Sequence, residues 1–141
     1  MTTMFIIHLA VTAALAGLIW TIQIVHYPLF KEVGNKEFIL YHQRHMDSIS
    51  WLVGPLMLAE LASAGLLLFL GERSVLFLSS LAALGLIWAS TALIQIPLHQ
   101  LLTSGHDPRA IDRLVRTNWW RTAAWTLRGA CLVLHLIQKF S

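Results

Sequence analysis

Four histidines lie near the ends of apolar stretches, where their side chains can meet. They are His26, His42, His45 and His99. His42 and His45 are three residues apart, a spacing that lets two imidazoles on one helix face reach the same ion. Imidazole ligands suit zinc, copper or iron, and two of them can bind haem. An imidazole also gains or loses a proton near neutral pH. The four histidines therefore predict a metal, haem or acid–base site.

Amide, guanidinium and indole groups lie at the same end of the predicted helices as these histidines. Asn118 and Arg121 begin the last apolar stretch. A guanidinium there can hold an oxyanion, so both residues are candidates for catalysis. Gln23, Gln95 and Trp125 fall on the same helical stripes as these groups, which predicts contacts with a bound cofactor or substrate.

Two charged residues, Glu60 and Arg128, lie deeper within apolar stretches. An ionised side chain near the middle of a bilayer costs at least about 2.5–3.5 kcal/mol, so such residues face the protein interior and find partners. We therefore predict an ion pair between Glu60 and Arg128. Together with Asn118 and Arg121, both residues are candidates for catalysis. The alternative is that the pair only fixes the register of the helices.

The elements that must position these residues are apolar helices. Of the 141 residues, 57% are hydrophobic and 12% are charged, whereas about a quarter of a soluble domain is charged. A soluble globular domain is thereby excluded. Apolar runs long enough to cross about 30 Å of hydrocarbon predict one all-α transmembrane domain over residues 1–141, an integral membrane four-helix bundle. The spans are about 4–26, 38–70, 74–98 and 109–138, with Asp107 capping the last helix.

The remaining histidines and several tryptophans have simpler interpretations. His8, His106 and His135 have no convergent partners in this pattern, so we expect them to form hydrogen bonds at the headgroup level. Trp51, Trp119 and Trp120 fall where aromatic belts are expected.

The basic residues indicate an orientation. Six of them lie in the two longer loops and two on the opposite side, which places both longer loops in the cytoplasm and both termini in the periplasm of an inner membrane. The charge excess is explained by this bias and predicts no nucleic-acid partner. Membrane lipids are the expected partners, with a lipophilic small molecule or a metal ion as ligand; monomer and homodimer are both open.

Two short segments resemble each other. His26-Tyr27-Pro28-Leu29-Phe30 ends the first span and Gln95-Ile96-Pro97-Leu98-His99 ends the third. Two helical hairpins related by a pseudo-two-fold axis along the membrane normal would produce this pattern. Independent use of a proline near a helix end is the alternative.

Several of these segments carry a wider resemblance. Four segments resemble those of a group of four-span bacterial membrane proteins of uncharacterised activity. They are Ile22-Gln23-Ile24-Val25-His26-Tyr27-Pro28, Tyr41-His42-x-x-His45, Gln95-Ile96-Pro97-Leu98-His99 and Thr117-Asn118-Trp119-Trp120-Arg121-Thr122. More distantly, the layout and the residues Asn118 and Arg121 resemble the anthrone-oxygenase-like family. That resemblance implies oxidation of a flat phenolic substrate, with Asn118, Arg121 and the nearby histidines as substrate contacts.

Three functions are compatible with these features. The first is a membrane-embedded enzyme of the redox or oxygenase type, acting on a lipophilic substrate at the cytoplasmic end. The second is a module that binds or transports a metal ion or a proton, with Glu60 and Arg128 as its gate. The third is a structural membrane subunit.

Overall fold

The computed structural model describes residues 1–140, with Phe140 described by its backbone alone, and all regular structure in this range is helical. The predicted all-α class is therefore confirmed for these residues. The longer helices are α1 (Thr2–Thr21), α3 (Phe38–Phe69), α4 (Val75–Ser90) and α6 (Pro108–Phe140). The shorter helical segments are η1 (Ile22–His26), α2 (Tyr27–Leu29), η2 (Phe30–Glu32), η3 (Thr91–Gln95) and α5 (Ile96–Leu102).

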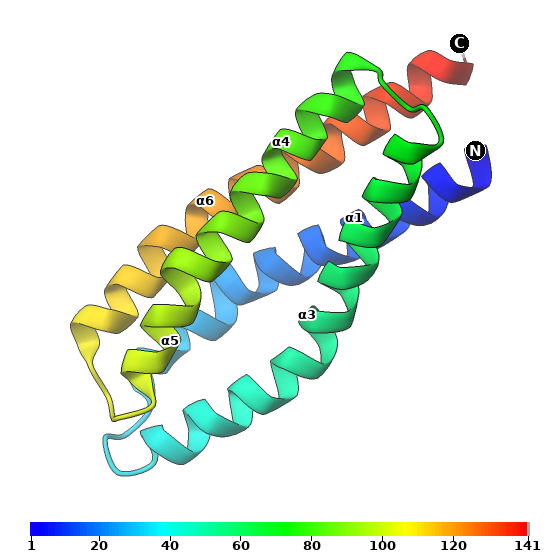
Figure 1. Ribbon diagram of the computed structural model, residues 1–141. Coiled ribbons are helices and arrows are strands. Elements are labelled where there is room, and N and C mark those ends of the chain that lie inside the picture. The colour runs from blue at the N-terminus through cyan, green and yellow to red at the C-terminus, as the bar shows by residue number, and fades with distance from the viewer. Residues whose placement is uncertain (141) are drawn as a thin grey trace.

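The helices form two hairpins that pack against each other (Figure 1). Both termini and the loop between α3 and α4 lie at one end, which we call the terminal end. The loops 33–37 and 103–107 lie at the other end, which we call the histidine end. α1 packs on α3 and α6, and α4 packs along α6, whereas α3 and α4 have little direct contact although they follow each other in the chain.

Three helical stretches are long and apolar enough to cross a membrane, by length and composition: Thr2–Glu32, Phe38–Phe69 and Val75–Leu102. Their exposed side chains include many large hydrophobic ones, such as Trp51, which is 84% exposed. The fourth predicted span, 109–138 in α6, is helical but is not among the three. Arg121 and Arg128 lie within its apolar part and lower its hydropathy.

Local signals explain where the helices begin and end. The predicted cap of α6 is confirmed: Asp107 Oδ1 accepts hydrogen bonds from the backbone N–H groups of Arg109 and Ala110, at 2.9 and 3.2 Å. The hydroxyl of Ser74 caps α4 by accepting from the Phe77 N–H. Gly71 follows α3 with φ +94°, a conformation that favours glycine and stops the helix.

The four continuous helical stretches, which we call the rods, are Thr2–Glu32, α3, Val75–Leu102 and α6. Two π-helical segments interrupt the first and third rods, each just before a proline. Both segments, η1 and η3, end two residues before a proline, Pro28 and Pro97 respectively. The wider turn lets the chain remain helical past a residue that lacks an N–H group. The first rod therefore continues to Glu32 and the third to Leu102, beyond the predicted ends at 26 and 98.

Each π segment also shifts the buried face of its helix by one residue. In α1 the buried positions follow helical spacing through Phe5, His8, Thr12, Leu15 and Ile19. Continuing this spacing would bury residues 26 and 29, yet residues 27 and 30 are buried. In the third rod, regular α-helical spacing from Phe77, Ser80, Leu84 and Ile87 gives positions 94, 98 and 101. Of these Leu98 is buried, and Gln95, His99 and Leu102, one residue further on, are buried as well.

An ion pair between Glu60 and Arg128 joins α3 to α6 in the middle of the protein. Arg128 Nε donates to Glu60 Oε1 at 2.8 Å, and both side chains are fully buried. Trp125 Nε1 donates to Glu60 Oε2 at 3.2 Å, and the Thr12 hydroxyl donates to Glu60 Oε1 at 2.8 Å. The pair predicted from the sequence is thus present, and both carboxylate oxygens have protein donors.

His8 belongs to the same network. Its Nε2 lies 2.8 Å from Arg128 Nη2, and its Nδ1 lies 2.6 Å from the Ser63 hydroxyl. Arg128 Nη1 donates to the backbone oxygen of Ser80 in α4 at 2.7 Å. The expectation that His8 lies at the headgroup level without convergent partners is wrong, because helical spacing carries its ring inward on the same stripe as Thr12. All four rods therefore contribute to one buried polar network.

At the terminal end, His135 ties α6 to the α3–α4 loop, so it also has partners that the sequence pattern did not predict. Its Nδ1 lies 3.0 Å from the Ser74 hydroxyl and its Nε2 3.5 Å from Glu72 Oε2. Burial favours the neutral form of Glu72, but hydrogen bonds from Ser74 and the charges of His135 and Lys139 outweigh it and lower the pKa of this carboxyl. The stability that Glu72 contributes is therefore present at neutral pH and lost as the pH falls through this lowered pKa.

The buried pair should control stability. We expect Glu60→Leu and Arg128→Met each to lower the free energy of unfolding by about 3–5 kcal/mol, because each leaves an uncompensated buried charge. The double variant should lose much less than the sum of the two losses. Unfolding in detergent measures all three.

Arg116→Met is the matched control, since Arg116 is exposed on the same helix, and it should change stability by less than about 0.5 kcal/mol. Single variants as stable as this control would contradict the assignment of the network.

Candidate functional site

A cavity of about 270 Å³ lies at the histidine end, between α3 and the stretch that runs from η3 into α5. We call it the histidine pocket. Apolar side chains such as Ile49, Val53 and Ile96 form much of its wall. Its side chains with larger polar groups come from all four rods and are Tyr27, His45, Gln95, His99 and Arg121.

Three buried side chains form a row on one side of the pocket. The Tyr27 hydroxyl lies 3.0 Å from His99 Nε2, and His42 Nε2 lies 3.0 Å from His99 Nδ1. Both ring nitrogens of His99 thus have a partner at hydrogen-bond distance. This row can share a proton between Tyr27, His99 and His42.

A second row of polar groups fixes Arg121. Gln23 Nε2 donates to the backbone oxygen of Val115 at 3.1 Å, and Asn118 Nδ2 donates to Gln23 Oε1 at 2.9 Å. Arg121 Nη1 then donates to Asn118 Oδ1 at 3.0 Å, and its guanidinium carbon lies 5.2 Å from the ring centre of Trp125. Arg121 is 6% exposed, so a buried cation is held in place beside the pocket.

Three polar groups in the pocket wall have no hydrogen-bond partner among residues 1–140. Arg121 Nε and Gln95 Oε1 are buried, and neither is paired. His45 contacts the rings of Phe30, His26 and His99 but forms no hydrogen bond in the described part of the chain. Since buried polar groups are normally paired, the free donor of Arg121 and the free acceptor of Gln95 indicate a binding site, and the half-buried imidazole of His45 lies beside them.

The predicted site residues other than His26 fall into four groups. Gln95, Arg121, His45 and His99 line the pocket, and Gln23, Asn118 and His42 support them from behind. Trp125 packs under Arg121 and donates to Glu60. Glu60 and Arg128 do not line the pocket, and their charged groups are satisfied by the buried network. The structure thus gives these two a structural position away from the other catalytic candidates.

The four predicted metal ligands do not surround a common centre. Their ring contacts run in a chain, with centroid distances of 5.6 Å from His26 to His45, 6.4 Å from His45 to His99 and 5.3 Å from His99 to His42. Within residues 1–140, no group of three or more His, Cys, Asp or Glu side chains is placed to hold a metal ion. In addition, His42 and His99 use ring nitrogens to contact each other, which leaves fewer lone pairs for a metal.

Tyr27 is the pocket residue that sequence reasoning missed. Regular helical spacing turns His26 inward, whereas the π segment η1 turns Tyr27 inward and leaves His26 partly exposed. The available signal was Pro28, because a helix that continues through a proline often contains a local irregularity before it.

Comparisons of the chain with family models, with curated proteins and with solved structures found no match. The resemblances described from the sequence therefore stay predictions. The function proposed below is inferred from the pocket and its surroundings.

Gln23 and Gln95 can be compared to test which of the two side-chain amides stabilises the fold. Gln23→Met should lower the free energy of unfolding by about 1–3 kcal/mol, because it leaves the buried Asn118 amide without its acceptor. Gln95→Met should cost less, because Gln95 has one hydrogen bond, to Thr117 at 3.2 Å, and an unpaired Oε1. Equal losses, measured by unfolding in detergent, would contradict this division.

Proposed function

We propose that the protein is a membrane-embedded enzyme that acts on a lipophilic substrate in the histidine pocket. In this proposal α6 is the fourth span of an integral membrane four-helix bundle, and the chain lies in a bacterial inner membrane with both termini in the periplasm. The observation that carries the proposal is the pair of buried, unpaired atoms Arg121 Nε and Gln95 Oε1 in the wall of one largely apolar cavity, with the half-buried His45 ring beside them.

These groups suit a substrate with an acidic hydroxyl, such as a phenol or an enol. His45 accepts the proton of that hydroxyl, since its ring has no hydrogen-bond partner in the described residues. The oxyanion that remains accepts a hydrogen bond from Arg121 Nε, whose guanidinium is already held by Asn118. Gln95 Oε1 accepts a second donor of the substrate and so orients it.

The position of the pocket favours a substrate that arrives from the lipid. The pocket lies between α3 and the third rod, which have little direct contact. A molecule dissolved in the bilayer can therefore approach sideways between them. With about 270 Å³ the pocket holds a small polar ring and leaves the rest of a larger molecule outside.

An oxygenase-type reaction is the specific form of this proposal. The anion formed in the pocket is rich in electrons, and the distant resemblance to the anthrone-oxygenase-like family implies oxidation of a flat phenolic substrate. Proton abstraction by His45 and stabilisation by Arg121 are the steps that the chain's own residues perform.

The alternative functions have less support. A gate formed by Glu60 and Arg128 would need side chains that can separate, but both are fully buried and tied to all four rods. A metal or haem site remains testable by elemental analysis and a visible spectrum of the purified protein. Stoichiometric zinc, copper or iron would favour His26, His42, His45 and His99 as ligands over the proton-transfer proposal.

Binding of para-ethylphenol tests the proposal. We expect the detergent-purified protein to bind it more tightly than ethylbenzene, which has the same shape without the hydroxyl. Arg121→Gln should weaken binding of the phenol about tenfold, because a hydrogen bond from a charged donor is worth about 1.5–3 kcal/mol. Calorimetric titration measures each affinity.

Arg116→Gln is the control, since Arg116 lies on the same helix but is exposed and outside the pocket. It should bind both molecules as the unchanged protein does. Equal affinity for para-ethylphenol and ethylbenzene, or no effect of Arg121→Gln, would overturn the proposal.

A further inference from the structure

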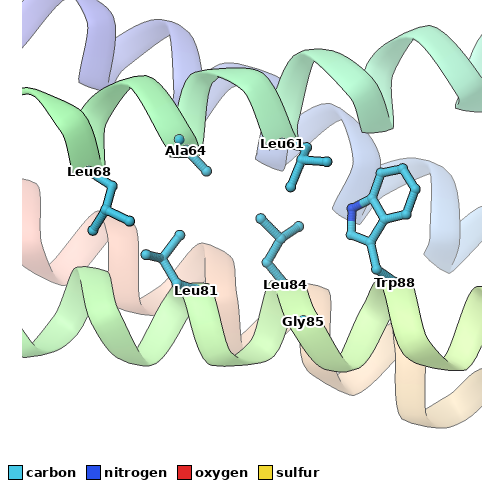
Figure 2. Close-up of a pocket in the computed structure, with 8 residues that line it drawn as sticks. Leu61, Ala64, Leu68, Leu81, Leu84, Gly85 and Trp88 are labelled. Atoms are coloured by element: carbon cyan, nitrogen blue, oxygen red, sulfur yellow. The ribbon is translucent and has the colours of Figure 1, made fainter.

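A second cavity, of about 300 Å³, lies between α3 and α4 on the terminal side of the histidine pocket. Figure 2 shows leucine side chains from the two helices pointing toward one another across it, with Trp88 at one end. We call this cavity the α3–α4 groove. Its lining is almost entirely apolar, and includes Leu61, Ala64, Leu68, Leu81, Leu84 and Trp88.

The groove and the histidine pocket follow one line along the same two rods. On α3, Gly54 of the pocket and Leu61 of the groove are two helical turns apart and therefore share a face. On the third rod, Trp88 of the groove is followed by Thr91 of the pocket, about 4.5 Å further along the helix. A ligand in the pocket that is too long for it can therefore continue into the groove.

Trp88 marks the junction between the two cavities. Its indole Nε1 is buried and has no hydrogen-bond partner in the described part of the chain. Figure 2 shows this nitrogen on the side of the ring that faces Leu61 and Leu84, which is the inside of the groove. A buried donor without a partner normally indicates a missing acceptor, so the occupant of the groove should carry an acceptor at this point.

We propose that the substrate is a single amphipathic molecule with an acidic hydroxyl head, a hydrogen-bond acceptor next to it and one long apolar tail. The head occupies the histidine pocket, the acceptor meets Trp88 Nε1, and the tail lies in the α3–α4 groove. This inference rests on the proposed function, because it places the head on Arg121 and His45. It adds the class of substrate, a tailed lipid rather than a compact ring compound.

Two glycines offer variants that test the tail. Gly85 lines the groove at an exposed position, and a Cβ added there meets no atom within 4 Å, so Gly85→Leu adds bulk to the groove without a clash at its Cβ. Gly17 on α1 has the same open surroundings and lies in neither cavity, so Gly17→Leu is the matched control.

The probes are para-ethylphenol and para-dodecylphenol, titrated into detergent-purified protein. We expect Gly85→Leu to weaken binding of the dodecyl probe about fivefold and to leave the ethyl probe unchanged. The tail moves into the groove from a detergent micelle and not from water. The binding free energy that it adds therefore comes from packing contacts and is modest. Comparing each variant with the unchanged protein for the same probe cancels the partitioning of that probe into the detergent.

The outcomes separate the two proposals. If both phenols bind but Gly85→Leu affects neither, or affects both equally, the tail does not lie in the groove and the proposed function stands. If neither phenol binds better than its alkylbenzene counterpart, the proposed function fails and this inference fails with it. A dodecyl-specific loss that also appears in Gly17→Leu would overturn the groove assignment.

Trp88→Phe tests the acceptor. It should weaken binding of dodecyl para-hydroxybenzoate, which has an ester beside its ring, about fivefold, and should leave para-dodecylphenol unchanged. The same change for both molecules would overturn the contact with Trp88 Nε1.

Discussion

A charge pair buried among apolar helices is the constraint on which the rest of the structure depends. Glu60 and Arg128 cannot face lipid without a large penalty, so α3 and α6 must present them to each other. Trp125 satisfies the other carboxylate oxygen of Glu60. Thr12, His8 and the Ser80 backbone also bond to the pair and bring α1 and α4 to the same point. The charged groups of Glu60 and Arg128 thus find all their partners within this network. The polar groups of the histidine pocket are not needed for it and can bind a ligand.

The histidine pocket differs from the network in this respect. Its rows of partners, Tyr27–His99–His42 and Gln23–Asn118–Arg121, hold side chains in place but stop short of satisfying them. The two π segments help to place the pocket residues of the first and third rods, because each one shifts the buried stripe by one residue just before the histidine end. Each π segment lies just before a proline, Pro28 or Pro97, and the helices remain continuous through both.

Hydropathy and helical spacing predict much of the architecture, but they do not predict which side chains line the histidine pocket. The ion pair follows from the depth of Glu60 and Arg128, and the start of α6 follows from Asp107 and Pro108. The inward position of Tyr27, the extension of the rods past Pro28 and Pro97, and the role of His8 depend on local turns and on tertiary partners. Regular α-helical periodicity contains no information about a π turn, so it favoured His26 over Tyr27.

Arg128 belongs to a closed polar network, whereas Arg121 belongs to an open one with an unpaired Nε. The ¹⁵N resonances of the two Nε–H groups, recorded in detergent during addition of para-ethylphenol, compare them within one sample. The account predicts that the Arg121 signal moves with saturation and that the Arg128 signal stays in place. A stationary Arg121 signal, or equal movement of both, would contradict it.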